Sequence, residues 1–125
     1  MTHLRSIELL QYVRSHVPGS YYVNEFPATA KDAAAFIRVT GGYSPGEFVK
    51  RPSFQVVTRD AAANMSKAEA HALAIFDHFH DLRECRISEG CVLRNVMADQ
   101  SEPIYLGRDD NSRPMYSINF TATIL

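Results

Sequence analysis

The sequence lacks the residues and runs typical of extracellular or membrane proteins. It has no tryptophan and two cysteines, Cys85 and Cys91, without a histidine at the spacing of a zinc motif. No apolar run approaches the ~20 residues that span a bilayer. The first six residues contain neither an apolar signal core nor a small-residue cleavage site. We therefore expect reduced thiols, no membrane partner and folding in the cytoplasm.

The chain also lacks an excess of charge of either sign. Its 13 basic and 14 acidic residues leave a formal net charge of −1, which gives no electrostatic reason to expect direct nucleic-acid recognition. A hydrophobic fraction of 46% and a charged fraction of 22% are ordinary for a globular protein. At 125 residues, the length predicts one domain over residues 1–125.

Catalytic and metal-binding motifs are missing as well. There is no phosphate-binding glycine loop and no nucleophile elbow around a serine. His78 and His80 would point about 200° apart on a helix, whereas ligands of one ion need spacings of three or four. We therefore expect no metal, cofactor or catalytic residue. An enzyme would require His71, His78, Cys85 or Asp81 to converge in a cleft.

Apolar periodicity predicts two helices. One covers residues 2–16, with Thr2 as N-cap and a stop at Pro18-Gly19. The other runs from a capping box formed by Ser66 and Glu69 to about residue 83. Its predicted apolar stripe contains Ala68, Ala72, Ile75, Phe76, Phe79 and Leu82.

Strand patterns occupy most of the remaining chain. They lie at residues 21–26, 34–40, 53–59, a hairpin or bent strand at 86–98, and a last strand at 116–124. The order is α-β-β-β-α-β-β, which predicts an α+β two-layer sandwich, with a mostly antiparallel sheet and both helices on one face. In the last strand, apolar residues alternate with uncharged polar ones such as Ser117 and Asn119. A neighbouring subunit can cover such a polar face without burying an unpaired charge.

Two segments between these elements are candidates for contacts. Residues 41–52 contain three glycines and two prolines, which predicts a long, irregular and mobile loop. Apolar residues on it, such as Tyr43 and Phe48, favour docking. Residues 108–113 superficially resemble a calcium loop but lack its glycine and its terminal glutamate. They form either a locally paired turn or a subunit contact, and both interpretations stay open.

Three passages carry a resemblance to a known family. They are Phe54-Gln55-Val56-Val57-Thr58-Arg59-Asp60, the alanine-rich helix that follows, and the segment from Pro103 through Leu106-Gly107-Arg108-Asp109 to Phe120. Together they resemble small minor capsid and tail terminator proteins of tailed bacteriophages. The resemblance spans about residues 50 to 120. It implies a non-enzymatic homohexameric ring that caps the tail tube of a long-tailed phage, stops its polymerisation and joins the head.

The resemblance also implies the partners and the location. The partners would be further copies of the chain, the tail tube protein and a head completion or connector protein. The location would be the head-proximal end of the virion tail, after assembly in the bacterial host cytoplasm. We expect the subunit interface at Arg59, Arg108, Asp109, Asp110, Arg113, Ser117 and Asn119, and a docking loop at Tyr43, Glu47, Phe48, Val49, Lys50 and Arg51. The main alternative is a small ligand-binding or regulatory module with a closed pocket.

Overall fold

The computed structural model describes residues 2–125 and contains two helices and one seven-stranded sheet. The helices are α1 (Ser6–His16) and α2 (Met65–Phe79). The strands are β1 (Tyr21–Val23), β2 (Ala34–Gly46), β3 (Val49–Arg59), β4 (Leu82–Ser88), β5 (Cys91–Ala98), β6 (Ile104–Arg108) and β7 (Pro114–Thr123). Neither helix within residues 2–125 is long and apolar enough to cross a membrane.

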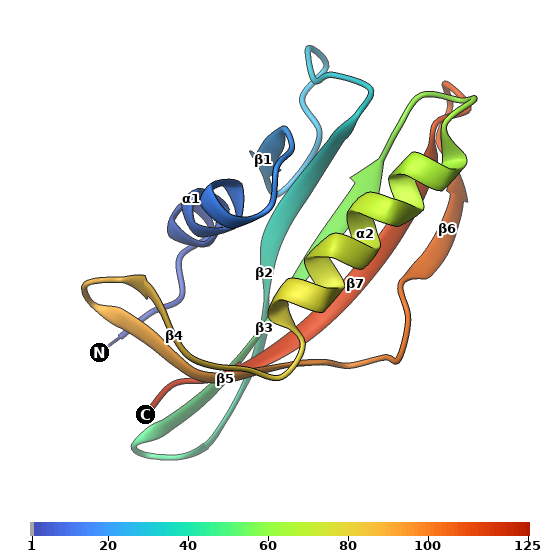
Figure 1. Cartoon of the computed structure of the whole chain (residues 1–125). Helices are drawn as coiled ribbons and strands as arrows, with labels where there is room; N and C mark the ends of the chain where they lie inside the picture. Colours follow the sequence, from blue (N-terminus) through green and yellow to red (C-terminus); the bar gives the residue numbers. More distant parts are fainter. Residues whose placement is uncertain (1) are drawn as a thin grey trace.

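The sheet is mixed and curls around the helices. Its strand order is β1-β2-β3-β7-β5-β4, and β6 pairs with the first half of β7. β1 runs parallel to β2. The other neighbouring pairs are antiparallel, namely β2–β3, β3–β7, β7–β5 and β5–β4. Figure 1 shows α1 beside β1 and β2, and α2 lying along β3 and β7. The α+β class is confirmed. The predicted two-layer sandwich is not confirmed, because the sheet forms a curled half-barrel.

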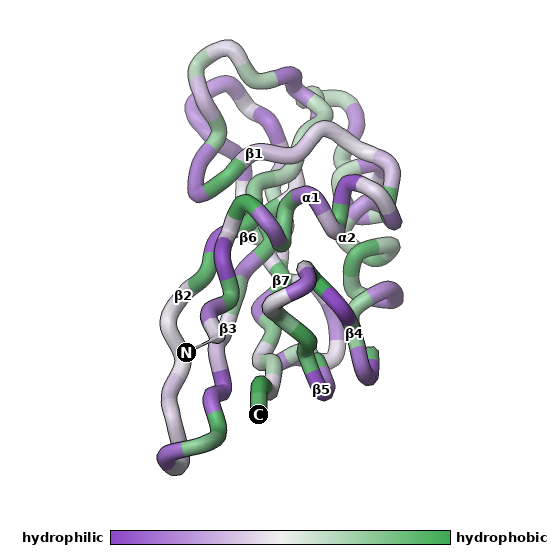
Figure 2. The backbone as a smooth tube through the Cα atoms, turned by 90° about the vertical axis from the view of Figure 1, so that its left-hand side faces the viewer, coloured by the Kyte–Doolittle hydropathy of each residue, from purple (hydrophilic) through white to green (hydrophobic). Residues whose placement is uncertain are grey.

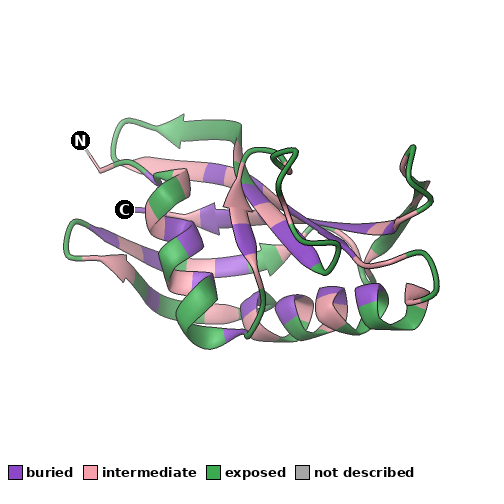
Figure 3. Cartoon of the chain, turned by 90° about the horizontal axis from the view of Figure 1, so that it is seen from above, coloured by how far each residue is buried: buried purple, intermediate pink, exposed green. Residues whose placement is uncertain are grey.

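One hydrophobic cluster fills the side of the sheet that faces the helices. The alternation of β7 places Ile118 and Phe120 fully inside, as the sequence predicted for this strand. The Phe120 ring stacks on Phe54 of β3 with centroids 5.0 Å apart, and Phe79 of α2 packs 5.3 Å from both rings. Figure 3 shows buried segments on the central strands and on the inner sides of both helices. These three aromatic rings join α2 to the middle of the sheet.

The glycine- and proline-rich segment 41–52 is not an irregular loop. β2 and β3 continue through it as a ribbon that turns at Glu47 and Phe48 and projects from the body (Figure 2). The pairing register shifts after Val39 and again after Tyr43, so the glycines lie at or beside irregularities of the ladder. A Cβ on Gly42, where φ is +94°, would lie 2.1 Å from the backbone oxygen of Arg51. The predicted absence of regular structure is wrong, because glycine here permits a close strand approach. The expected mobility stays a prediction.

Both boundaries of α2 differ from the sequence prediction. The helix begins after Asn64, and no side-chain hydrogen bond caps it, so the capping box at Ser66 and Glu69 is wrong. It ends at Phe79 because His80 is already extended and Asp81 adopts a φ of +59°. The residues that follow belong to β4, which pairs with β5. Helical periodicity thus continued in the sequence beyond the end of the helix.

Smaller corrections concern the first helix and the strands. α1 begins at Ser6 after Arg5, so Thr2 is not its N-cap. β1 stops at Val23 because Asn24 takes a φ of +71°. β6 was not predicted as a strand, and β4 is longer than expected. β6 is recognisable only through its pairing with β7, since its sequence lacks alternation.

Candidate functional site

Asp109 lies at the centre of the predicted charged turn, which joins β6 to β7. Its Oδ1 accepts the backbone N–H groups of Asn111 at 2.9 Å and Arg113 at 3.0 Å. Its Oδ2 accepts Nε–H of Arg113 at 2.8 Å and lies 3.9 Å from Nη1 of Arg59. Partial desolvation raises the pKa of Asp109, but these hydrogen bonds outweigh it and hold the pKa below its usual range. The carboxylate therefore closes the turn in its ionised form.

Arg59 is a buried member of the same cluster. Its side chain is 4% exposed, and its Nη2 donates to the carbonyl of Lys31 at 2.9 Å. The guanidinium stacks over the Phe26 ring, 4.0 Å from the centroid. Desolvation and the nearby Arg113 cation lower its pKa, yet an arginine at this position stays charged. Arg59 thus fastens the 24–33 segment to the sheet and is not an open contact surface of the single chain.

The remaining residues of the predicted interface lie at the end of β6, in the turn that follows it and on β7. Arg108 is exposed and donates from Nη1 to the carbonyl of Ala62 at 2.9 Å, which ties the turn to the segment before α2. Asp110 is exposed, Asn119 is half-buried, and Ser117 is 1% exposed. The structure therefore brings Arg59, Asp109 and Arg113 together, with Arg108 beside them. Ser117 and Asn119 lie apart from that cluster. A role of these residues between subunits stays a prediction.

The sheet face turned away from the helices carries a row of paired polar side chains. Gln55 of β3 accepts Nε–H of Arg38 at 2.8 Å and donates to Oγ of Ser117, also at 2.8 Å. Thr40 and Ser53 pair through their hydroxyls at 2.7 Å. The polar face predicted for β7 therefore extends over β2 and β3. Sequence reasoning missed this row because it depends on the cross-strand register.

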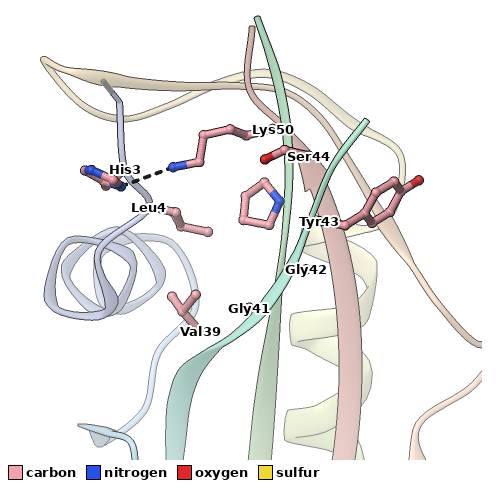
Figure 4. Close-up of a pocket in the computed structure, with 9 residues that line it drawn as sticks. His3, Leu4, Val39, Gly41, Gly42, Tyr43, Ser44 and Lys50 are labelled. Atoms are coloured by element: carbon pink, nitrogen blue, oxygen red, sulfur yellow. Dashed lines mark hydrogen bonds between the residues drawn. The ribbon is translucent and has the colours of Figure 1, made fainter. Parts of the chain in front are cut away.

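The predicted docking residues divide into an exposed tip and a base. Phe48 is 80% exposed and Tyr43 is 60% exposed, and Glu47 beside them is also exposed. Val49, Lys50 and Arg51 are half-buried. Lys50 reaches back to the body, where its Nζ donates to the Thr2 carbonyl at 2.7 Å and lies 3.1 Å from Nδ1 of His3 (Figure 4). Among these predicted docking residues, the large apolar side chains that face solvent are Tyr43 and Phe48, at the tip.

Lys50 also borders an open groove between this hairpin and the N-terminal segment. The groove has a volume of about 320 Å³. Leu4 and Val39 point into it, and the backbone from Gly41 to Ser44 forms one wall (Figure 4). Tyr43 points away from it. The groove is open to solvent, unlike the closed pocket that a ligand-binding module predicts.

Of the side chains considered for catalysis, His78 and Cys85 meet at one tyrosine, whereas His71 lies in a different contact. His78 lies 2.8 Å from the hydroxyl of Tyr12, and Cys85 lies against the same hydroxyl. Burial raises the pKa of the Cys85 thiol, although the Tyr12 hydrogen bond opposes this, and burial lowers the pKa of His78. His71 bonds to Tyr21 instead. The grouping holds a neutral thiol and a neutral imidazole, without an activated nucleophile. Within residues 2–125 no three potential ligands are placed to share a metal ion.

The fold and these surfaces define a small α+β protein with a projecting hairpin, exposed strand edges and an internally paired charged cluster. A family model described as bacteriophage tail terminator protein matches residues 3–125. The chain therefore belongs to the bacteriophage tail terminator family, in agreement with the resemblance noted in its sequence. No curated protein matches it at a significant level. The family is one of structural proteins, so the chain is a structural component of a phage virion.

Proposed function

We propose that the chain assembles into a homohexameric ring that caps the tail tube of a long-tailed phage. The ring ends polymerisation of the tube and offers its other side to the head. The family match over residues 3–125 carries this proposal. The partners are further copies of the chain, the tail tube protein and a head completion or connector protein. The ring occupies the head-proximal end of the tail, after assembly in the host cytoplasm.

The surface of the chain supports a role in assembly without catalysis or a cofactor. A net charge of −1 limits the repulsion among six close copies. The hairpin tip, with Phe48 80% exposed, projects beyond the body and is suited to contact a partner. Arg108 and Asp110, which are exposed next to the charged cluster in sequence, remain accessible for contacts between copies. The buried Arg59 positions this cluster from below.

Electron microscopy tests the proposal directly. The purified chain is imaged by negative stain alone and after mixing with purified tail tubes of its phage. We expect six-fold rings, either free or at one end of each tube, and tubes that no longer elongate when more tube protein is added. A chain that stays monomeric in both samples and leaves tube growth unchanged would refute the proposal.

A further inference from the structure

The sheet has unpaired strand edges on opposite sides of the molecule. At one side, β6 pairs with β7 and has no strand on its other edge within the described chain. At the other side, β1 pairs with β2 only along Ala35–Ile37, so no strand among residues 2–125 lies beside the outer edge of residues 40–46. Figure 1 shows β6 at the right-hand margin of the molecule, and β1 and β2 on the other side of β3 and β7, next to α1. Apart from Pro45, which has no N–H, these open edges present backbone N–H and C=O groups that can pair with another strand.

β6 is apolar as well as open along its outer edge. Ile104, Tyr105 and Leu106 follow one another in the strand, and they are 44%, 47% and 48% exposed. Tyr105 rests on Tyr116 with ring centroids 5.3 Å apart, which leaves its other side open. Three consecutive exposed apolar residues on an edge strand form a surface that natural monomers normally avoid.

The β2 edge offers a complementary surface. Gly41 and Gly42 leave the backbone uncovered by side chains, and Tyr43 points away from the groove (Figure 4). The groove beside this edge is floored by Leu4 and Val39 and has a volume of about 320 Å³. Residues 40–46 carry no charge, and neither do residues 104–107. The two segments therefore carry no charge of their own into the contact, and Lys50, which borders the groove, keeps its hydrogen bond to the Thr2 carbonyl.

We infer that β6 of one copy adds as a strand to the free edge of β2, residues 40–46, in the next copy. An apolar side chain of β6 then enters the groove over Leu4 and Val39. This inference rests on the proposed ring. We call this contact between β6 of one copy and residues 40–46 of the next copy the seam. A second copy is the occupant because one chain carries both surfaces on opposite margins of its sheet. Two different surfaces that meet head to tail are what a closed ring of identical subunits requires.

Cysteine cross-linking tests the seam in the assembled full-length chain. Ser44→Cys on β2 is combined in one chain with Tyr105→Cys or with Leu106→Cys on β6. The two β6 positions are neighbours, so they sample opposite faces of the strand. The native Cys85 and Cys91 are 5% and 2% exposed and are shielded from the reagent. After treatment with a short bismaleimide, we expect a denaturing gel to show a ladder of bands up to six chains for at least one pair.

Three controls make the result specific. Each single-cysteine variant alone should give no ladder. A mixture of Ser44→Cys chains with chains that carry only Tyr105→Cys or only Leu106→Cys should give cross-linked products of no more than two chains. Ser44→Cys combined with Ala74→Cys, on the exposed face of α2, should also give no ladder. Circular dichroism and ring images confirm that the variants fold and assemble.

The outcomes distinguish the seam from the ring. If both double-cysteine variants form rings but give no ladder, the proposed β6–β2 contact is overturned and the proposed function stands. If the native chain forms no ring either alone or on tail tubes, the proposed function falls and the seam falls with it. A ladder that also appears with Ala74→Cys would reflect random collision and would overturn the seam.

Discussion

Asp109 is the residue that connects the charged cluster to the stability of the single chain. It satisfies two backbone N–H groups and pairs with Arg113, beside the buried Arg59 cation. We expect Asp109→Asn to lower the free energy of unfolding by about 1.5 to 3 kcal/mol, because hydrogen bonds to a charged group are lost near a buried arginine. Urea denaturation measures this. Asp110→Asn, an exposed neighbour, is the matched control and should change stability by under about 0.5 kcal/mol.

The same carboxylate predicts a dependence on pH. Because the folded chain holds the pKa of Asp109 below its usual range, its contribution is fully present above the unfolded pKa of about 3.9. The contribution is lost as the pH falls through the folded value. The difference in stability between the native chain and Asp109→Asn should therefore shrink below about pH 4. Equal stability of the two chains at pH 7 would mean that the turn does not need the charge of Asp109. A contact between subunits would then be the remaining role proposed for this residue.

His71 predicts a second loss of stability, nearer neutrality. Tyr21 donates its hydroxyl proton to the Val17 carbonyl at 2.8 Å, so the 2.8 Å contact with His71 requires a proton on Nε2 of the imidazole. Desolvation lowers the pKa of His71, although Asp60 opposes it. The neutral ring therefore stabilises the fold above the unfolded pKa of about 6.5, and this contribution is lost as the pH falls through the folded value.

The variant His71→Gln removes this titration while keeping an amide donor for Tyr21. Melting temperatures measured between pH 7.5 and 5 should fall less steeply for His71→Gln than for the native chain. Identical slopes for the two chains would show that His71 does not titrate in this range.

Within α2, the structure separates two phenylalanines that the sequence grouped in one stripe. Phe79 is fully buried between Phe54 and Phe120, whereas Phe76 is half-buried and stacks on His80. We expect Phe79→Ala to cost about 3 to 5 kcal/mol, and Phe76→Ala to cost less, because its ring leaves no enclosed cavity. Chemical denaturation of the two variants ranks them. The reverse ranking would contradict the packing described for α2.

The β2–β3 hairpin combines a regular backbone with an exposed tip. Its strands pair in register near the body, but the pairing is irregular between Tyr43 and Gly46. We expect amide hydrogen exchange to be fast at residues 43–48 of the free chain and to slow when a partner is bound, since few contacts hold the tip. Residues 53–58, in the middle of β3, are the internal control and should be protected in both states. Strong protection of the tip in the free monomer would count against docking.

At the scale of the whole molecule, folding, ring formation and tube capping depend on different surfaces. Phe48 lies at the hairpin tip, 80% exposed and away from the hydrophobic cluster. We expect Phe48→Ser to leave the circular dichroism spectrum and the ring unchanged, while binding to tail tubes in a pelleting assay falls at least tenfold. Glu89→Ser, at the exposed turn between β4 and β5, is the control. Unchanged binding by Phe48→Ser would remove the tip from the docking surface.

The sequence by itself determined the features that depend on local periodicity. It indicated the two helices, the α+β class and the buried face of β7, because apolar residues recur at helical or alternating spacing in those segments. The sequence also carries motifs that resemble the tail terminator family, and the family match over residues 3–125 agrees with them.

Only the tertiary structure decided the features that join distant segments. The pairing of Arg59 with Asp109, the contact of Tyr12 with His78 and the polar row through Gln55 each bring together residues far apart in the chain. The hairpin at 41–52 belongs here too, since Gly41 and Gly42 break a strand pattern locally but are tolerated once β3 pairs alongside. Local composition records which conformations a segment allows. Register and packing between strands select one of them, and that selection depends on contacts that no single stretch of sequence contains.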